Sequence, residues 1–250
     1  IGKEASGGLI TLERIFFGLK NEQEILQAHK LESANVKHFF EDSLIQILGI
    51  RDTHSGQEIT KNLYFELPKH VNIDFKIDGG NYTIKDMKGT SVLETLGGDI
   101  SIENLSGNIS LNTEGGDINI TNVEGILRSH SSGGEITTRD SNGELNLSTI
   151  GGDILLEGSK GILDILSSGG SINLVNVKAD KITCRSSGGV IQGNTISGKS
   201  ILQSFGNNIE LLNMSGDAEL YTSGGSIEID QFRGKAKCEA EAGNITLNNV

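Results

Sequence analysis

The sequence predicts a mainly β chain that folds as a single parallel β-solenoid. Three observations predict this fold: a repeated pair of glycines, alternation of apolar and polar residues between the pairs, and apolar columns that persist from repeat to repeat. The 250 residues include 34 glycines, which is roughly twice the usual share. The glycines have no three-residue period, so the chain is not collagen-like.

Pairs of glycine mark the start of each repeat. Consecutive pairs are 18 residues apart, with a single spacing of 19 between Gly169 and Gly188. A column of single glycines follows the pairs by ten residues, and Ala179 replaces one of its members. Each unit of 18 residues therefore has two nine-residue halves. The pairs are Gly79-Gly80, Gly97-Gly98, Gly115-Gly116, Gly133-Gly134, Gly151-Gly152, Gly169-Gly170, Gly188-Gly189 and Gly224-Gly225, with degenerate copies at Gly206-Asn207 and Ala242-Gly243.

Apolar and polar residues alternate after each glycine. In the unit that begins at Gly97, Ile100 and Ile102 alternate with Ser101 and Glu103. Such alternation is typical of a short strand with one buried face. One coil cannot bury its own apolar row, but coils stacked about 4.8 Å apart bury the rows as columns. The first of these columns is Tyr82, Ile100, Ile118, Ile136, Ile154, Ile172, Ile191, Ile209, Ile227 and Ile245.

The amino-terminal part, residues 1–78, is predicted to precede the solenoid at 79–250 as a first coil with a capping insertion. Residues 5–15 match the repeat, whereas residues 16–62 depart from it. We expect these departing residues to form a small α/β insertion that caps the first coil, because repeat arrays require capped ends. The elements expected here are a helix over 21–34 and strands within 36–50 and 63–77.

Charge and apolar content exclude some partners. The chain has 21 Lys and Arg against 33 Asp and Glu, which gives a net charge of −12. Non-specific nucleic-acid binding needs clustered Lys and Arg, so no nucleic-acid partner is expected. No apolar run approaches the length of a membrane span, so none is expected in these residues.

Residues 193–200, GNTISGKS, fit the phosphate-loop pattern G-x-x-x-x-G-K-[ST]. That chemistry requires a helix after the loop, whose amino end faces the phosphates. Here Gly198 is an ordinary glycine of the repeat, and the alternation continues through Ser200 and Leu202. We therefore expect no nucleotide cofactor at Lys199.

An acidic column follows the glycine pairs and is a weak candidate for a metal site. Stacked like charges repel, and a bound Ca²⁺ would relieve the repulsion. The column continues with Ser171 and Val190, which cannot serve as carboxylate ligands, and it lacks the Ca²⁺-binding aspartate pattern of β-roll repeats. We expect a solvated acidic corner and no metal. The acidic members are Asp99, Asp117, Glu135 and Asp153.

Two further columns are predicted to be structural. Asn and Asp tolerate left-handed turns, so a corner column rich in them is expected to be an asparagine ladder. Cys184 and Cys238 share an inward column three coils apart. That separation is roughly 14 Å, too far for a disulfide, so two buried, reduced thiols are expected. The corner column is Asn104, Asn122, Asp140, Asn176, Asn213, Gln231 and Asn249.

No catalytic constellation is apparent, so the chain is predicted not to be an enzyme. His130 is flanked by Ser129 and Ser131, but neighbouring side chains of a strand point to opposite faces and form no triad. An enzyme of the polysaccharide-lyase type would need carboxylates and basic residues clustered on one outer sheet. The arginines of the repeat lie on separated coils without a shared acidic partner: Arg128, Arg139 and Arg185.

The SGGDI-type corners and the segment LYFELPKHVNI at residues 63–73, which leads into the first glycine pair, resemble a bacterial adhesin family of β-strand-repeat proteins. The resemblance covers residues 63–250 well and 5–15 weakly, and the insertion at 16–62 departs from it. It implies a parallel β-helix in the cell envelope or outside the cell. It implies surface adhesion as a role, and it provides no catalytic residues. Bactofilins, polymer-forming cytoskeletal β-helices, are the nearest structural alternative.

The function expected from these observations is a non-enzymatic envelope scaffold that binds an unknown protein or glycan surface. The alternative is a bactofilin-like structural protein that polymerises end to end. The last coil stops at the corner residue Val250, which leaves a strand edge that recruits other strands unless it is covered. Outward aliphatic residues mark a partner surface or are incidental: Ile126, Ile162 and Leu166 on one face, Leu155 and Val175 on the other.

Overall fold

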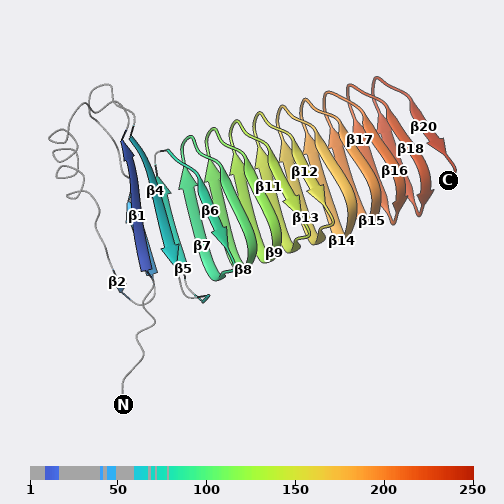
Figure 1. The fold of residues 1–250 in the computed structure, drawn as a ribbon. Helices are drawn as coiled ribbons and strands as arrows, with labels where there is room; N and C mark the ends of the chain where they lie inside the picture. Colours follow the sequence, from blue (N-terminus) through green and yellow to red (C-terminus); the bar gives the residue numbers. More distant parts are fainter. Residues whose placement is uncertain are drawn as a thin grey trace, which may run out of the picture.

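The computed structural model describes residues 9–16, 40–41, 44–48, 59–66, 69–70, 72–77 and 79–250. This part of the chain is built from strands and contains no helix. It winds into a parallel β-solenoid of about 10 turns with about 18 residues per turn. Figure 1 shows the coils stacked into a rod. The prediction of a mainly β, parallel solenoid is confirmed.

Each coil contributes one strand from each half, or one long strand that runs through the corner between the halves. The strands are β1 (Leu9–Phe16), β2 (Phe40–Glu41), β3 (Leu44–Leu48), β4 (Ile59–Glu66), β5 (Asn72–Ile77), β6 (Tyr82–Lys85), β7 (Lys88–Thr95), β8 (Ile100–Thr113), β9 (Ile118–Ser131), β10 (Ile136–Arg139), β11 (Asn142–Thr149), β12 (Ile154–Glu157), β13 (Lys160–Ser167), β14 (Ile172–Ser186), β15 (Ile191–Ser204), β16 (Ile209–Ser215), β17 (Ala218–Thr222), β18 (Ile227–Arg233), β19 (Ala236–Ala240) and β20 (Ile245–Asn248).

Equivalent strands of successive coils pair in parallel and in register. Strands β8 and β9, for example, pair from Ile100 with Ile118 to Thr113 with Ser131. The register shifts where the glycine spacing rises to 19. Ala179 pairs with Gly161 and Lys181 pairs with Ile162, so Asp180 is the extra residue of a β-bulge. Beyond the bulge the stack continues, which keeps the core columns intact.

The interior of the rod is filled by the predicted apolar columns. In the first column, each residue from Ile100 to Ile227 is 0% exposed. Ile245 of the same column is 44% exposed, because β20 pairs with a described strand, β18, on one side only. Burying these aliphatic side chains stabilises the fold by about 1.5–3 kcal/mol each.

The two cysteines differ in burial, so the prediction of two buried thiols is right for one and wrong for the other. Both are free, and Cys184 is buried whereas Cys238 is half-buried. Cys238 lies on β19, whose described neighbour β17 covers it on one side only. Burial raises the pKa of the Cys184 thiol, which keeps it protonated and unreactive.

A buried column of Ser and Thr hydroxyls bridges neighbouring coils at the glycine corner. The Thr149 hydroxyl donates to the carbonyl oxygen of Gly134, at the start of its own unit, at 3.0 Å. The same hydroxyl accepts the N–H of Gly152, at the start of the next unit, at 3.1 Å. This column was not predicted from the sequence. The same bridge recurs along the rod at Thr95, Thr113, Ser131, Thr149, Ser167, Ser186, Ser204 and Thr222.

The second glycine of each pair lies where successive backbones come closest. A Cβ atom added to Gly116 would overlap the carbonyl of Gly98 in the preceding coil. A Cβ added to the first glycine of the same pair, Gly115, would have its nearest neighbour at 3.6 Å, which is an ordinary contact. At Gly116 the stacking of coils therefore excludes a side chain, whereas at Gly115 there is room for one.

The described amino-terminal strands pair differently from the repeat. Strand β1 pairs antiparallel with β4, from Leu9 with Glu66 to Phe16 with Ile59. A strand of the predicted first coil would pair in parallel, so this segment does not continue the repeat in its strand pairing. Strand β3, within the predicted strand segment 36–50, pairs in parallel with β5. The helix expected over 21–34 lies outside the described residues, and the capping role of the insertion stays a prediction.

We expect Gly116→Ala to destabilise the protein strongly, because its methyl group meets the backbone of the preceding coil and neither side can yield. Overpacking of this kind costs about 1–3 kcal/mol or more. Gly115→Ala is the matched control and should leave the melting temperature close to that of the wild type. Thermal unfolding followed by circular dichroism measures both, and equal stabilities would contradict the assignment of the close approach to the second glycine.

We expect Thr149→Val to lower the free energy of unfolding by about 1–3 kcal/mol, because it leaves a buried N–H and a buried carbonyl without their shared partner. Thr149→Ser retains the hydroxyl and should recover most of the loss. Urea unfolding of the two variants and the wild type provides the measurement. A valine variant as stable as the serine variant would show that the hydroxyl bridge contributes nothing.

Candidate binding face

The acidic corner column forms a hydrogen-bond ladder between coils. Asp99 Oδ1 accepts the backbone N–H of Asp117 at 2.9 Å, and Asp117 Oδ1 accepts that of Glu135 at 2.8 Å. Asp153 Oδ1 accepts the N–H of Ser171 at 2.7 Å. Each bond gives a backbone N–H of one coil a carboxylate acceptor in the preceding coil. Among the described residues, no group of three or more His, Cys, Asp or Glu side chains is placed to hold a metal ion.

The asparagine column takes the left-handed conformation predicted for it. Its members have φ values between 50° and 59°, and its two gaps are filled by Thr195 at 58° and Gly158 at 64°. Neighbouring amides bond to one another, as where Asn122 Nδ2 donates to Asn104 Oδ1 at 2.7 Å. These polar side chains at the corner are therefore engaged in holding coils together.

The residues that fit the phosphate-loop pattern lie within one continuous strand. Strand β15 runs from Ile191 to Ser204, so no helix follows Gly198. Ser200 is buried and Lys199 is exposed, as the alternation of a strand requires. The geometry offers no cradle of backbone N–H groups for a phosphate.

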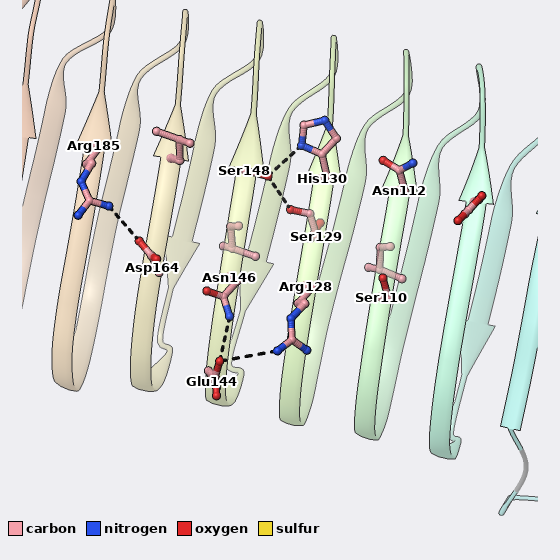
Figure 2. Close-up of a pocket in the computed structure, with 14 residues that line it drawn as sticks. Ser110, Asn112, Arg128, Ser129, His130, Glu144, Asn146, Ser148, Asp164 and Arg185 are labelled. Atoms are coloured by element: carbon pink, nitrogen blue, oxygen red, sulfur yellow. Dashed lines mark hydrogen bonds and ion pairs between the residues drawn. The ribbon is translucent and has the colours of Figure 1, made fainter.

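An open groove of about 720 Å³ lies on the outer side of the strands that form the second half of each coil. We call this side the second-half face: the outward positions that follow each single glycine, on β7, β8, β9, β11, β13, β14, β15, β17 and β19. Figure 2 shows the labelled groove side chains on neighbouring strands; apart from the buried Ser129, they project on this one side. Arg128 comes from β9, Asn146 and Ser148 from β11, and Asp164 from β13. Arg185 comes from β14 and lies at one end of the groove.

Arg128 lies in the middle of the groove and Arg185 at one end, and each faces a carboxylate on the coils between them. Arg128 lies 4.0 Å from Glu144, and Arg185 lies 3.6 Å from Asp164. These side chains are 46–61% exposed, so they are solvated surface pairs that contribute about 0–1 kcal/mol each. Arg185 Nε also donates to Gln203 Oε1 at 3.2 Å. Each arginine thus has its own acidic partner, and none is shared.

His130 finds its partner in the next coil rather than beside it in the sequence. Its Nδ1 lies 2.9 Å from Ser148 Oγ, and the Ser148 hydroxyl also donates to the Ser129 carbonyl at 3.4 Å. Ser129 and Ser131 are buried on the inner side, as predicted. Within residues 79–250, no carboxylate bonds to His130, so a Ser-His pair is present without the acidic group that orients a catalytic triad.

The outward aliphatic residues are concentrated on the second-half face. Ile162 and Leu166 are 50% and 43% exposed, and Leu166 lines the groove. Ile126 on this face is half-buried, as are Leu155 and Val175 on the opposite face. The groove therefore combines ionic, amide and hydroxyl groups with an apolar margin, a mixture suited to binding a polar ligand through its edges and its hydrocarbon surface.

Comparison with protein families, with curated proteins and with solved structures finds no match for this chain. The parallel β-solenoid is thus supported by the geometry of the chain itself, and the resemblance to an adhesin family stays a prediction. The part of the chain that the structure describes includes no helix long and apolar enough to cross a membrane.

We expect Asp117→Ala to lower the free energy of unfolding by about 0.5–1.5 kcal/mol, because the exposed N–H of Glu135 exchanges its carboxylate acceptor for water. Asp117→Asn keeps an oxygen at that position and should restore most of the stability. Melting temperatures in EDTA and in millimolar Ca²⁺ should agree for the wild type. A Ca²⁺-dependent increase that Asp117→Asn abolishes would instead make the acidic column a metal site.

Proposed function

We propose that the chain is a non-enzymatic scaffold of the bacterial cell envelope or cell surface that binds a glycan along the groove of its second-half face. The single observation that carries this proposal is the division of polar side chains between corners and face. The corner residues are bonded to the neighbouring coil, as Asp117 and Asn122 are. The groove residues occupy outward positions that the stacking of coils does not require.

The shape of the face favours an extended ligand. Groove residues lie on successive strands, which are spaced about 4.8 Å apart along the rod. A linear chain laid parallel to the rod can therefore contact Arg128, Asn146, Asp164 and Arg185 in turn. Planar guanidinium, amide and carboxylate groups can form paired hydrogen bonds with neighbouring hydroxyls of such a ligand.

An enzyme that cleaves polysaccharides is a second candidate, favoured by the presence of arginines, carboxylates and His130 in one groove. The binding role fits better, because Glu144 and Asp164 are 49% and 55% exposed. A general acid is normally desolvated so that it holds its proton near neutral pH. End-to-end assembly remains the alternative stated from the sequence. A further coil of the same chain and a second copy would cover the edge of β20 equally well.

The test is binding of the labelled full chain to an array of neutral and acidic oligosaccharides. We expect retention on at least one class, and an approximately tenfold or greater loss for the variant R128A/R185A, because the groove loses both of its guanidinium hydrogen-bond donors. The control is Arg139→Ala, which removes an arginine that pairs with Glu157 at 3.4 Å on the opposite face. All variants should keep the wild-type melting temperature.

Two results would contradict the proposal. One is the absence of binding to every oligosaccharide on the array. The other is an equal loss for the groove variant and the Arg139→Ala control. Release of new reducing ends from a bound oligosaccharide would favour the enzyme instead.

A further inference from the structure

Four lysines gather beside the groove, at the corner where the chain enters the second-half face. Lys160 pairs in register with Lys178 on the next coil, and Lys181 pairs in register with Lys199. All four are exposed. We call them the lysine patch. Like charges directly opposite one another on neighbouring strands, about 4.8 Å apart, repel and destabilise the pairing.

The lysine patch lacks the carboxylate partners that cations have on the other face. There, Lys85 pairs with Glu103 and Arg139 pairs with Glu157. No lysine of the patch forms an ion pair with a residue in the described part of the chain. Acidic residues are abundant, at 33 against 21 basic ones, so a shortage of carboxylates does not explain the difference.

The acidic residues near the lysine patch are few. Asp180 lies in the bulge between Lys178 and Lys181. Asp164 is engaged by Arg185, and Asp217 belongs to the coil beyond Lys199. Asp180 and Asp217 are therefore the carboxylates next to the patch, and of the four lysines Asp217 lies beside Lys199 only.

Elsewhere on the same face, lysine charges lie next to carboxylates. Lys237 pairs in register with Glu219 of the preceding coil, so each charge has an opposite neighbour. Lys235 and Lys199 lie with Asp217 around one small hollow. The stacked pairs Lys160–Lys178 and Lys181–Lys199 have the opposite pattern, with like charge next to like charge.

The lysine patch continues the groove. Lys181 and Arg185 lie on the same strand, β14, four positions apart, which is an even offset. Their side chains therefore leave the strand on the same side. A ligand that spans about 13 Å of strand, from Arg185 to Lys181, contacts the groove and the lysine patch together.

Resting on the proposed function, we infer that the glycan is an acidic one: a linear polysaccharide whose regularly spaced carboxylate groups contact the lysines of successive coils. At 0.1 M salt, charges beyond about 10 Å are screened. The patch therefore acts on a ligand locally, although the whole chain carries a net charge of −12. A single-stranded nucleic acid fits less well, because the lysine patch includes no aromatic side chain on which bases could stack.

The experiment titrates the full chain with a fluorescent oligogalacturonate and with its fully methyl-esterified form, which has the same backbone without the charges. We expect the wild type to bind the acid at least about tenfold more tightly than the ester. Four lysine contacts, with the salt slope of single-stranded polyanions, predict a weakening of roughly fifty-fold between about 50 and 200 mM NaCl. An oligonucleotide of equal charge should bind more weakly than the oligogalacturonate.

The test variant is K160Q/K178Q/K181Q/K199Q, and the control K69Q/K85Q/K88Q/R139Q removes the same charge on earlier coils, away from the patch. The test variant should lose the preference for the acid and most of the salt dependence, whereas the control should change affinity by less than about threefold. Because relief of stacked charges does not destabilise the strands, the test variant should melt at or above the wild-type temperature at low salt.

The outcomes separate the two proposals. Equal binding of the acid and the ester, with no effect of the test variant, overturns the inference and leaves the proposed function standing. Binding of neither form, together with a blank oligosaccharide array, overturns the proposed function and the inference with it. Tighter binding of the oligonucleotide than of the oligogalacturonate overturns the inference in favour of a nucleic acid.

Discussion

The close stacking of coils at the glycine corner is the constraint on which the rest of the structure depends. The second glycine of each pair has no side chain, so the backbones of successive coils approach there without steric overlap. This approach places a buried hydroxyl, such as that of Thr149, between a carbonyl of one coil and an N–H of the next. Buried backbone groups must be bonded, so the hydroxyl column stabilises the same corner that the glycines make possible. The two features require each other.

Fixed stacking at this corner also sets the register of every other column. Because equivalent residues of successive coils pair without offset, inward side chains form apolar columns and outward side chains form columns on the two faces. The single extra residue, Asp180, is accommodated as a bulge outside the core and changes no column. The second-half face can therefore place Arg128 and Arg185 in one groove, although they belong to different coils. The regular stack thus gives the second-half face a fixed arrangement of outward side chains.

The fold was accessible from the sequence because its strongest signals are local and repeated. The glycine spacing, the alternation after Gly97 and the corner asparagines each carry a conformational preference that recurs in every coil. The hydroxyl column recurs as regularly, yet it was missed, since Ser and Thr are mostly exposed in proteins and their burial follows only from the bonds they make here. Cys238 was expected to be buried as Cys184 is, because a column predicts orientation and not how many coils cover a residue.

By itself, the sequence determined the coil length, the inward columns and the left-handed corners, since each of these depends on a residue and its neighbours within one or two coils. The tertiary structure alone decided which outward side chains meet. Arg128 faces Glu144 and His130 faces Ser148 across coils, and such pairs depend on rotamers and on register that no single segment encodes. It also decided that β1 pairs antiparallel with β4 instead of continuing the repeat. A segment with the repeat's alternation can pair in either direction, and only its partners in space select one.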